Sequence, residues 1–107
     1  MFRITSGKGF HITFENGYTV SVQWGPGNYC DNHDVRIYPE EPPERGWESR
    51  EAETAVWAEG GKLIALEDGG DSVQGYRTPA QVLELLNWAA AQPAKVAVAK
   101  EAPNDPA

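Results

Sequence analysis

Two short runs of alternating apolar residues flank residues 15–17 (ENG), and their pairing constrains the fold more than any other feature of the sequence. A two-residue turn would pair Phe14 with Thr19 and place the two apolar sets on opposite faces. A three-residue loop pairs Phe14 with Tyr18 and buries both sets together. We therefore predict a β-hairpin with a type I turn and a left-handed Gly17 in a G1 bulge. The sets are Phe10, Ile12 and Phe14, and Tyr18, Val20, Val22 and Trp24, so Ile12 pairs with Val20 and Phe10 with Val22.

The clearest helix signal begins at Thr78, which fits the N-cap of a capping box with Gln81 at N3 and Pro79 at the first helical position. An apolar stripe at helical spacing follows and should lie on the sheet. Pro93 ends the predicted helix. The stripe consists of Val82, Leu85, Leu86 and Ala89.

Further strands are predicted on both sides of this first hairpin. Residues 2–5 alternate, and residues 54–59 and 62–67 form a second hairpin around a two-residue Gly60-Gly61 turn that pairs Trp57 with Ile64. Alternation at residues 35–38 is compatible with another strand, and the proline-rich residues 39–53 indicate a loop. The predicted fold class is α+β: an antiparallel sheet of four to six strands packed against one C-terminal helix.

Length and composition indicate one domain over residues 1–92 and a flexible tail over residues 93–107. A single cysteine cannot form an internal disulfide, and the start of the sequence lacks the apolar stretch of a signal peptide. No apolar run approaches the roughly 20 residues that span a bilayer. We expect a cytoplasmic protein that does not bind membranes.

The net charge of −7 is concentrated between residues 40 and 59, a stretch that contains seven glutamates and two arginines. Such a surface repels phosphate, which disfavours direct contact with nucleic acid. It either keeps the protein soluble, as charge runs commonly do, or fits a basic groove on a protein partner.

Residues 24–34 (WGPGNYCDNHD) carry the densest set of chemically capable side chains. Cys30 and His33 have a zinc-compatible spacing, but no second ligand pair follows, and His11, Asp31 and Asp34 would have to complete a site. A Cys30 nucleophile lacks a local family signature, and a small buried apolar role is commoner for a lone cysteine. The glycine-rich turns lack the Lys-Ser/Thr ending of a phosphate loop. We predict no metal, no cofactor and no catalytic residue.

Recognition is the role that best fits this loop, because loops on a rigid sheet commonly carry binding sites. The alternative for its polar residues is local capping of backbone amides, and for Trp24 closure of the core. The predicted binding residues are Asn28, Tyr29, Asp31, Asn32, His33 and Asp34 in the loop, with Glu40, Glu41, Glu44 and Trp47 in the acidic stretch.

The segment GFHITFENGYTVSVQWGPGNYCDN, with the later TAVW and GYRTPAQVLELLNWA, resembles small uncharacterised proteins of bacteriophages and mobile elements. The resemblance covers residues 6–34 closely and residues 54–90 loosely. It implies a non-enzymatic accessory protein that binds a host protein, of the class of anti-defence (anti-CRISPR-like) inhibitors. The alternative is a small-ligand protein that sequesters a nucleotide with the same loop, residues 24–34, and self-association as a homo-oligomer is left open. A metal-dependent or cysteine-dependent enzyme is the third reading.

Overall fold

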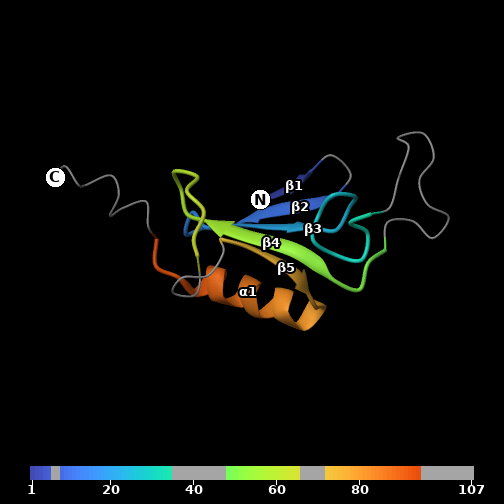
Figure 1. The fold of residues 1–107 in the computed structure, drawn as a ribbon. Helices are drawn as coiled ribbons and strands as arrows, with labels where there is room; N and C mark the ends of the chain where they lie inside the picture. The colour runs from blue at the N-terminus through green and yellow to red at the C-terminus, as the bar shows by residue number, and fades with distance from the viewer. Residues whose placement is uncertain (6–7, 35–47, 66–71, 95–107) are drawn as a thin grey trace.

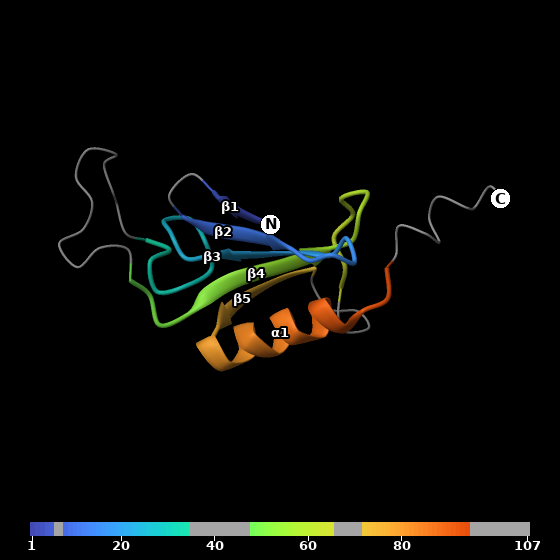
Figure 2. The ribbon, with the colours of Figure 1, turned by 180° about the vertical axis from the view of Figure 1, so that it is seen from behind.

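The computed structural model describes residues 1–5, 8–34, 48–65 and 72–94. It shows a five-stranded antiparallel sheet in the order β1-β2-β3-β4-β5 with one helix, α1, against one face (Figures 1 and 2). The predicted α+β class is therefore confirmed. The elements are β1 Phe2–Ile4, β2 Gly9–Thr13, β3 Thr19–Gln23, β4 Ala52–Trp57, β5 Val73–Arg77 and α1 Pro79–Ala91.

The first hairpin has the predicted register. Ile12 lies opposite Val20, and the backbone N–H of Phe14 donates to the carbonyl of Tyr18 at 2.9 Å. The loop closes with a bond of 3.0 Å from the N–H of Gly17 to the carbonyl of Phe14, and Gly17 has φ +89°. Only this register places both apolar sets on the face that meets α1.

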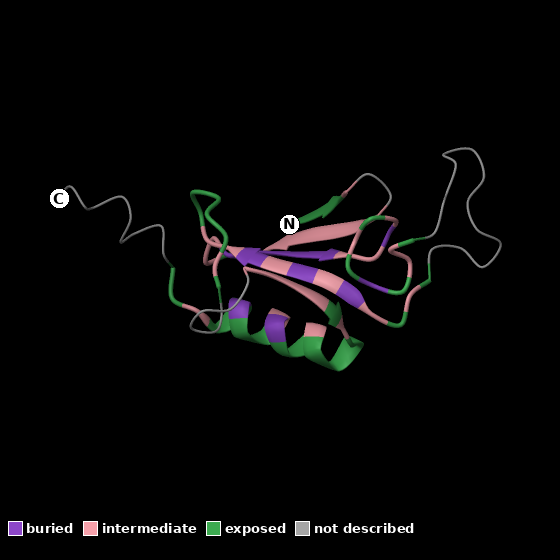
Figure 3. Cartoon of the chain, viewed as in Figure 1, coloured by how far each residue is buried: buried purple, intermediate pink, exposed green. Residues whose placement is uncertain are grey.

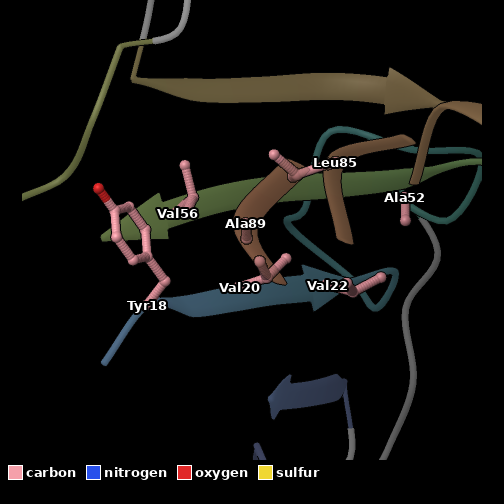
Figure 4. Packing of buried hydrophobic residues seen from close by; sticks show 7 residues of the cluster. All are labelled: Tyr18, Val20, Val22, Ala52, Val56, Leu85 and Ala89. Atoms are coloured by element: carbon pink, nitrogen blue, oxygen red, sulfur yellow. The ribbon is translucent and has the colours of Figure 1, made fainter. Parts of the chain in front are cut away.

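The core lies between α1 and the middle of the sheet. Figure 4 shows side chains of β3, β4 and α1 converging, with Val20, Val56 and Ala89 almost completely buried. The predicted stripe on α1 supplies Leu85 and Ala89, and Val82 and Leu86 pack beside them. Tyr18, Val22 and Ala52 complete the buried cluster.

Both ends of α1 are fixed by specific polar groups. The side chain of Thr78 accepts from the N–H of Gln81, and the side chain of Gln81 accepts from the N–H of Thr78, which confirms the capping box. At the other end the Asn16 side chain donates to the carbonyls of Ala89 at 2.8 Å and Gln92 at 2.7 Å. The turn of the first hairpin thus satisfies carbonyls that a helix end leaves without partners.

The predicted register of the second hairpin is wrong by one residue. Trp57 lies opposite Leu63 rather than Ile64, and the N–H of Ile64 donates to the carbonyl of Val56 at 2.8 Å. This register puts Ile64 on the core face beside Val56, where it packs against the buried cluster. The chain after Gly61 makes a single bridge to β4 in the described residues. The rest of that edge of β4 pairs with β5.

Strand β5 is not among the strands predicted from the sequence. The possible strand at residues 35–38, the proline-rich residues up to 47 and the tail from residue 95 lie outside the described residues.

The helix covers only part of the sheet. It packs on β3, β4 and β5 and on neither β1 nor β2. Two rows of directly opposed residues therefore run from the buried middle to an uncovered edge, and Figure 3 shows β1 as exposed throughout. The rows are Val56, Val20, Ile12 and Phe2, and Thr54, Val22, Phe10 and Ile4.

Candidate recognition loop

Residues 24–34 form a compact loop at the end of β3. Asn28 closes the first turn, because its backbone N–H donates to the carbonyl of Gly25 while its Oδ1 accepts from the N–H of Gly25, both at 3.1 Å. A bond of 3.0 Å from the N–H of Gly27 to the carbonyl of His33 joins the two ends of the loop, and Gly27 has φ +84°. The loop is thus held in part by hydrogen bonds within its own backbone.

Two neighbouring strands fix the loop to the sheet. The carboxylate of Glu53 on β4 accepts from Asn28 Nδ2 at 3.0 Å and from the backbone N–H of Tyr29 at 3.2 Å. On β5, the N–H of Tyr76 donates to the carbonyl of Tyr29 at 2.8 Å. A Cβ atom added at Gly75 would lie 2.5 Å from Cβ of Tyr29, so the loop packs directly on the glycine backbone.

The other side of the loop is tied to residues 48–50. Asn32 Nδ2 donates to the carbonyls of Trp24 at 2.7 Å and Glu48 at 3.0 Å. Arg50 Nε lies 2.9 Å from a carboxylate oxygen of Asp31. The side-chain hydrogen bond from Arg50 lowers the pKa of Asp31, whereas partial desolvation raises the pKa of the adjacent Glu51.

The predicted binding residues of the loop consequently fall into two groups. Asn28, Asp31 and Asn32 bond to the protein itself, which matches the local capping role that the sequence left open. Tyr29, His33 and Asp34 face solvent. The rings of Tyr29 and His33 are stacked, with centroids 5.6 Å apart and planes 5° from parallel, and His33 Nδ1 lies 2.9 Å from Asp34 Oδ1.

Tyr76 contacts the loop through its backbone N–H, which donates to the carbonyl of Tyr29, although nothing in the sequence pointed to it. It is 53% exposed and is a non-glycine residue with positive φ, at +55°. A positive φ costs a non-glycine residue on the order of 1 kcal/mol. Here it occurs at the residue whose N–H donates to the carbonyl of Tyr29. Only the contact between β5 and the loop reveals this residue as part of the surface.

The two hypotheses of chemistry at Cys30 gain no geometric support. Cys30 is buried, and its Sγ contacts the carbonyl of Gly25 at 3.8 Å. His11 lies on β2 opposite Ser21, with its ring against Trp57. Its pKa is lowered, mainly by burial and to a lesser extent by the positive charge of Arg3. Within the described ranges, no group of three or more His, Cys, Asp or Glu residues is placed to hold a metal ion.

Part of the predicted acidic contact stretch has a different role. Glu53 anchors the loop to β4, and the backbone of Glu48 accepts from Asn32. Glu40, Glu41, Glu44 and Trp47, which were predicted to bind a partner, lie outside the described residues.

A separate groove of about 410 Å³ lies between α1 and β5. It is lined by Arg77, whose Nε is buried and has no hydrogen-bond partner among the described residues. Gln74, Glu84 and Trp88 also line it, so cationic, amide, carboxylate and aromatic side chains share this groove. A buried donor without an acceptor is uncommon in folded proteins and calls for an explanation.

Comparison with protein-family models, curated proteins and solved structures found no match. In the described part of the chain, no helix has the length and apolar character that crossing a membrane requires. The loop and the sheet that carries it define an α+β scaffold with an exposed aromatic pair.

Proposed function

We propose that this protein is a non-enzymatic binding protein that acts by contact with another protein through residues 24–34. The stacked Tyr29–His33 pair is the observation that carries the proposal. The backbone of Tyr29 is bonded to Glu53 and to Tyr76, so the position of the exposed pair is set by the sheet before a partner binds.

Fixed aromatic side chains suit protein recognition for two reasons. They supply a large contact area with few rotatable bonds, so little conformational entropy is lost on binding. Tyrosine is also enriched among residues that dominate interface energies. Asp34 adds an exposed negative charge beside the pair, and the glutamates of residues 40–53 extend the acidic surroundings in the sequence. A partner with a basic, partly apolar surface fits this chemistry.

The resemblance to phage-encoded proteins makes a host protein the expected partner, and an inhibitor of a defence system the expected class. The acidic character supports a partner whose basic groove otherwise holds nucleic acid. Replacing Glu40, Glu41 and Glu44 by lysine should then abolish binding at moderate salt. Unchanged binding by that variant would remove the electrostatic part of the proposal.

Quantitative capture from a lysate of the expected host tests the loop, with the partner then purified and its affinity measured. The double variant Tyr29→Ala/His33→Ala should lose the partner and raise its Kd at least tenfold. Leu63→Ser is the matched control and should leave Kd unchanged. Leu63 is an exposed apolar residue opposite Trp57, at the end of β4 that lies away from the loop. Equal affinity of the double variant and the control would refute the role of the loop.

A second candidate, a protein that binds a small anionic ligand such as a nucleotide, is favoured by the groove at Arg77. The buried Nε of Arg77 would gain an acceptor from a phosphate, and the ring of Trp88 offers a face for a base. Titration with AMP, followed by the Nε–H resonance of Arg77, tests this candidate. A saturable shift that Trp88→Ala weakens supports it, whereas unchanged resonances at millimolar AMP rule out nucleotide binding there.

A further inference from the structure

The most exposed apolar side chains of the described residues gather at one edge of the sheet. Phe2 is 76%, Ile4 82% and Met1 73% exposed, although a folded chain normally buries such groups. Phe2 and Ile4 point to the same face as Val20 and Val22, because each lies in a row of directly opposed residues. The face that forms the core under α1 therefore continues, uncovered, across β2 and β1.

We propose that a second copy of this chain covers this apolar half-sheet, which consists of Phe2, Ile4, Phe10, Ile12 and Phe14. The two half-sheets would pack face to face about a twofold axis, so that the same surface is used on both copies. The proposal does not involve the recognition loop and stands independently of the proposed function.

The dimensions of the molecule suit this arrangement. Two packed sheets lie about 10 Å apart, and a helix has a diameter of about 10 Å. A second half-sheet placed on β1 and β2 would therefore occupy the same layer as α1 of the first copy.

Pairing of two β1 edges is the less favourable alternative. The backbone hydrogen bonds from Thr13 to Met1 and from Thr5 to Gly9 show that the N–H and C=O groups of odd-numbered residues point to β2. The N–H and C=O groups of Phe2 and Ile4 therefore point to the open edge. A strand of three residues offers few such bonds. Edge pairing would also leave the side chains of Phe2 and Ile4 in water, since side chains stand perpendicular to the sheet.

The available area corresponds to a weak, reversible dimer. A fully exposed aromatic side chain presents on the order of 200 Å², so Phe2 and Ile4 together offer roughly 300 Å² on each copy. With the half-buried Phe10, Ile12 and Phe14 this becomes about 450 Å² per copy and about 900 Å² in total, which is in the range of weak, transient contacts. We therefore expect a reversible dimer rather than an obligate one.

Charge distinguishes a second copy from a partner with a basic surface. The chain carries a net charge of −7, but no acidic or basic side chain belongs to the half-sheet. Two copies repel one another through the rest of their surfaces, and salt screens that repulsion. Self-association should therefore strengthen as salt is added, whereas contact with a basic partner should weaken.

Sedimentation velocity over a range of protein and salt concentrations tests the proposal. The wild-type chain of 11.7 kDa should form a dimer whose Kd lies between micromolar and millimolar and falls with added salt. Ile4→Ser should raise that Kd at least tenfold, because a twofold interface loses the contact twice. Leu63→Ser, which removes an exposed apolar side chain on the other side of the sheet, should leave it unchanged.

Isotope-filtered NMR on mixed labelled and unlabelled samples locates the contact. Cross-peaks between the methyl groups of Ile4 or Ile12 of one copy and phenylalanine rings of the other are expected. A monomer at millimolar concentration overturns the proposal, whether or not another protein binds the half-sheet. A dimer that Ile4→Ser leaves intact, or that lacks these cross-peaks, overturns it as well.

Discussion

Replacement of Asn16 by alanine tests how the first hairpin and α1 are held together. The Asn16 side chain donates to the carbonyls of Ala89 and Gln92 and accepts from the N–H of Tyr18 at 3.0 Å. Each hydrogen bond contributes about 1 kcal/mol on average, which gives an upper value of about 3 kcal/mol. Water can reach part of the helix end in the variant, so we expect a loss of about 2 kcal/mol, equivalent to roughly 10 °C in Tm.

Urea unfolding followed by tryptophan fluorescence measures this loss of unfolding free energy. Asn16→Asp keeps an acceptor for Tyr18, but it loses both donors and places a negative charge at the C-terminal end of α1. It should therefore be at least as unstable as Asn16→Ala. Glu15→Ala, at the exposed neighbouring position, should change stability by less than about 0.5 kcal/mol. An Asn16→Asp variant as stable as wild type would contradict the donor role.

Three further predictions concern the turn and the loop. Gly17→Val should cost about 2 kcal/mol in the same unfolding assay, because Gly17 has φ +89°; a loss below about 0.5 kcal/mol would disprove the need for a left-handed residue there. Gly75→Ala should displace the loop, since its Cβ would lie 2.5 Å from that of Tyr29, and NMR shifts of Tyr29 that stay unchanged would contradict this packing. Because Arg50 lowers the pKa of Asp31 in the folded state, the stabilisation from this pair is present above the ordinary carboxyl range and lost as pH falls through the lowered pKa. A pH titration of Asp31 by NMR should show that Arg50→Ala raises this pKa, and an unchanged pKa would refute the pairing.

The first hairpin and the helix could be predicted because each rests on local rules. Only a three-residue loop buries both apolar sets, and Thr78 and Gln81 form a capping box that is visible in the sequence. The same burial rule, applied to Val56 and Ile64, gives the observed register of the second hairpin. It was missed because both faces of residues 54–67 are mildly apolar, so the pattern did not distinguish two registers.

Strand β5 and the organisation of the loop depend on contacts distant in sequence. Residues 73–77 (VQGYR) carry little alternation, and their extended conformation comes from pairing with β4. Likewise, nothing local indicates that Glu53 accepts bonds from Asn28 and Tyr29. The sequence therefore located the loop, but it could not separate the residues that hold the loop from those that face outward.

Dimerisation through the half-sheet would change how the recognition loop binds a partner. A twofold dimer through the β1–β2 half-sheet would present two copies of the Tyr29–His33 pair on one assembly. Binding to a dimeric or immobilised partner then gains from the second, intramolecular contact, whereas binding to a monomeric partner in solution does not. Ile4→Ser should therefore weaken capture on a partner-coated surface while leaving the solution Kd for a partner monomer unchanged. Equal loss in both formats would mean that the half-sheet contacts the partner directly, and the two surfaces would have to be assigned to one interface.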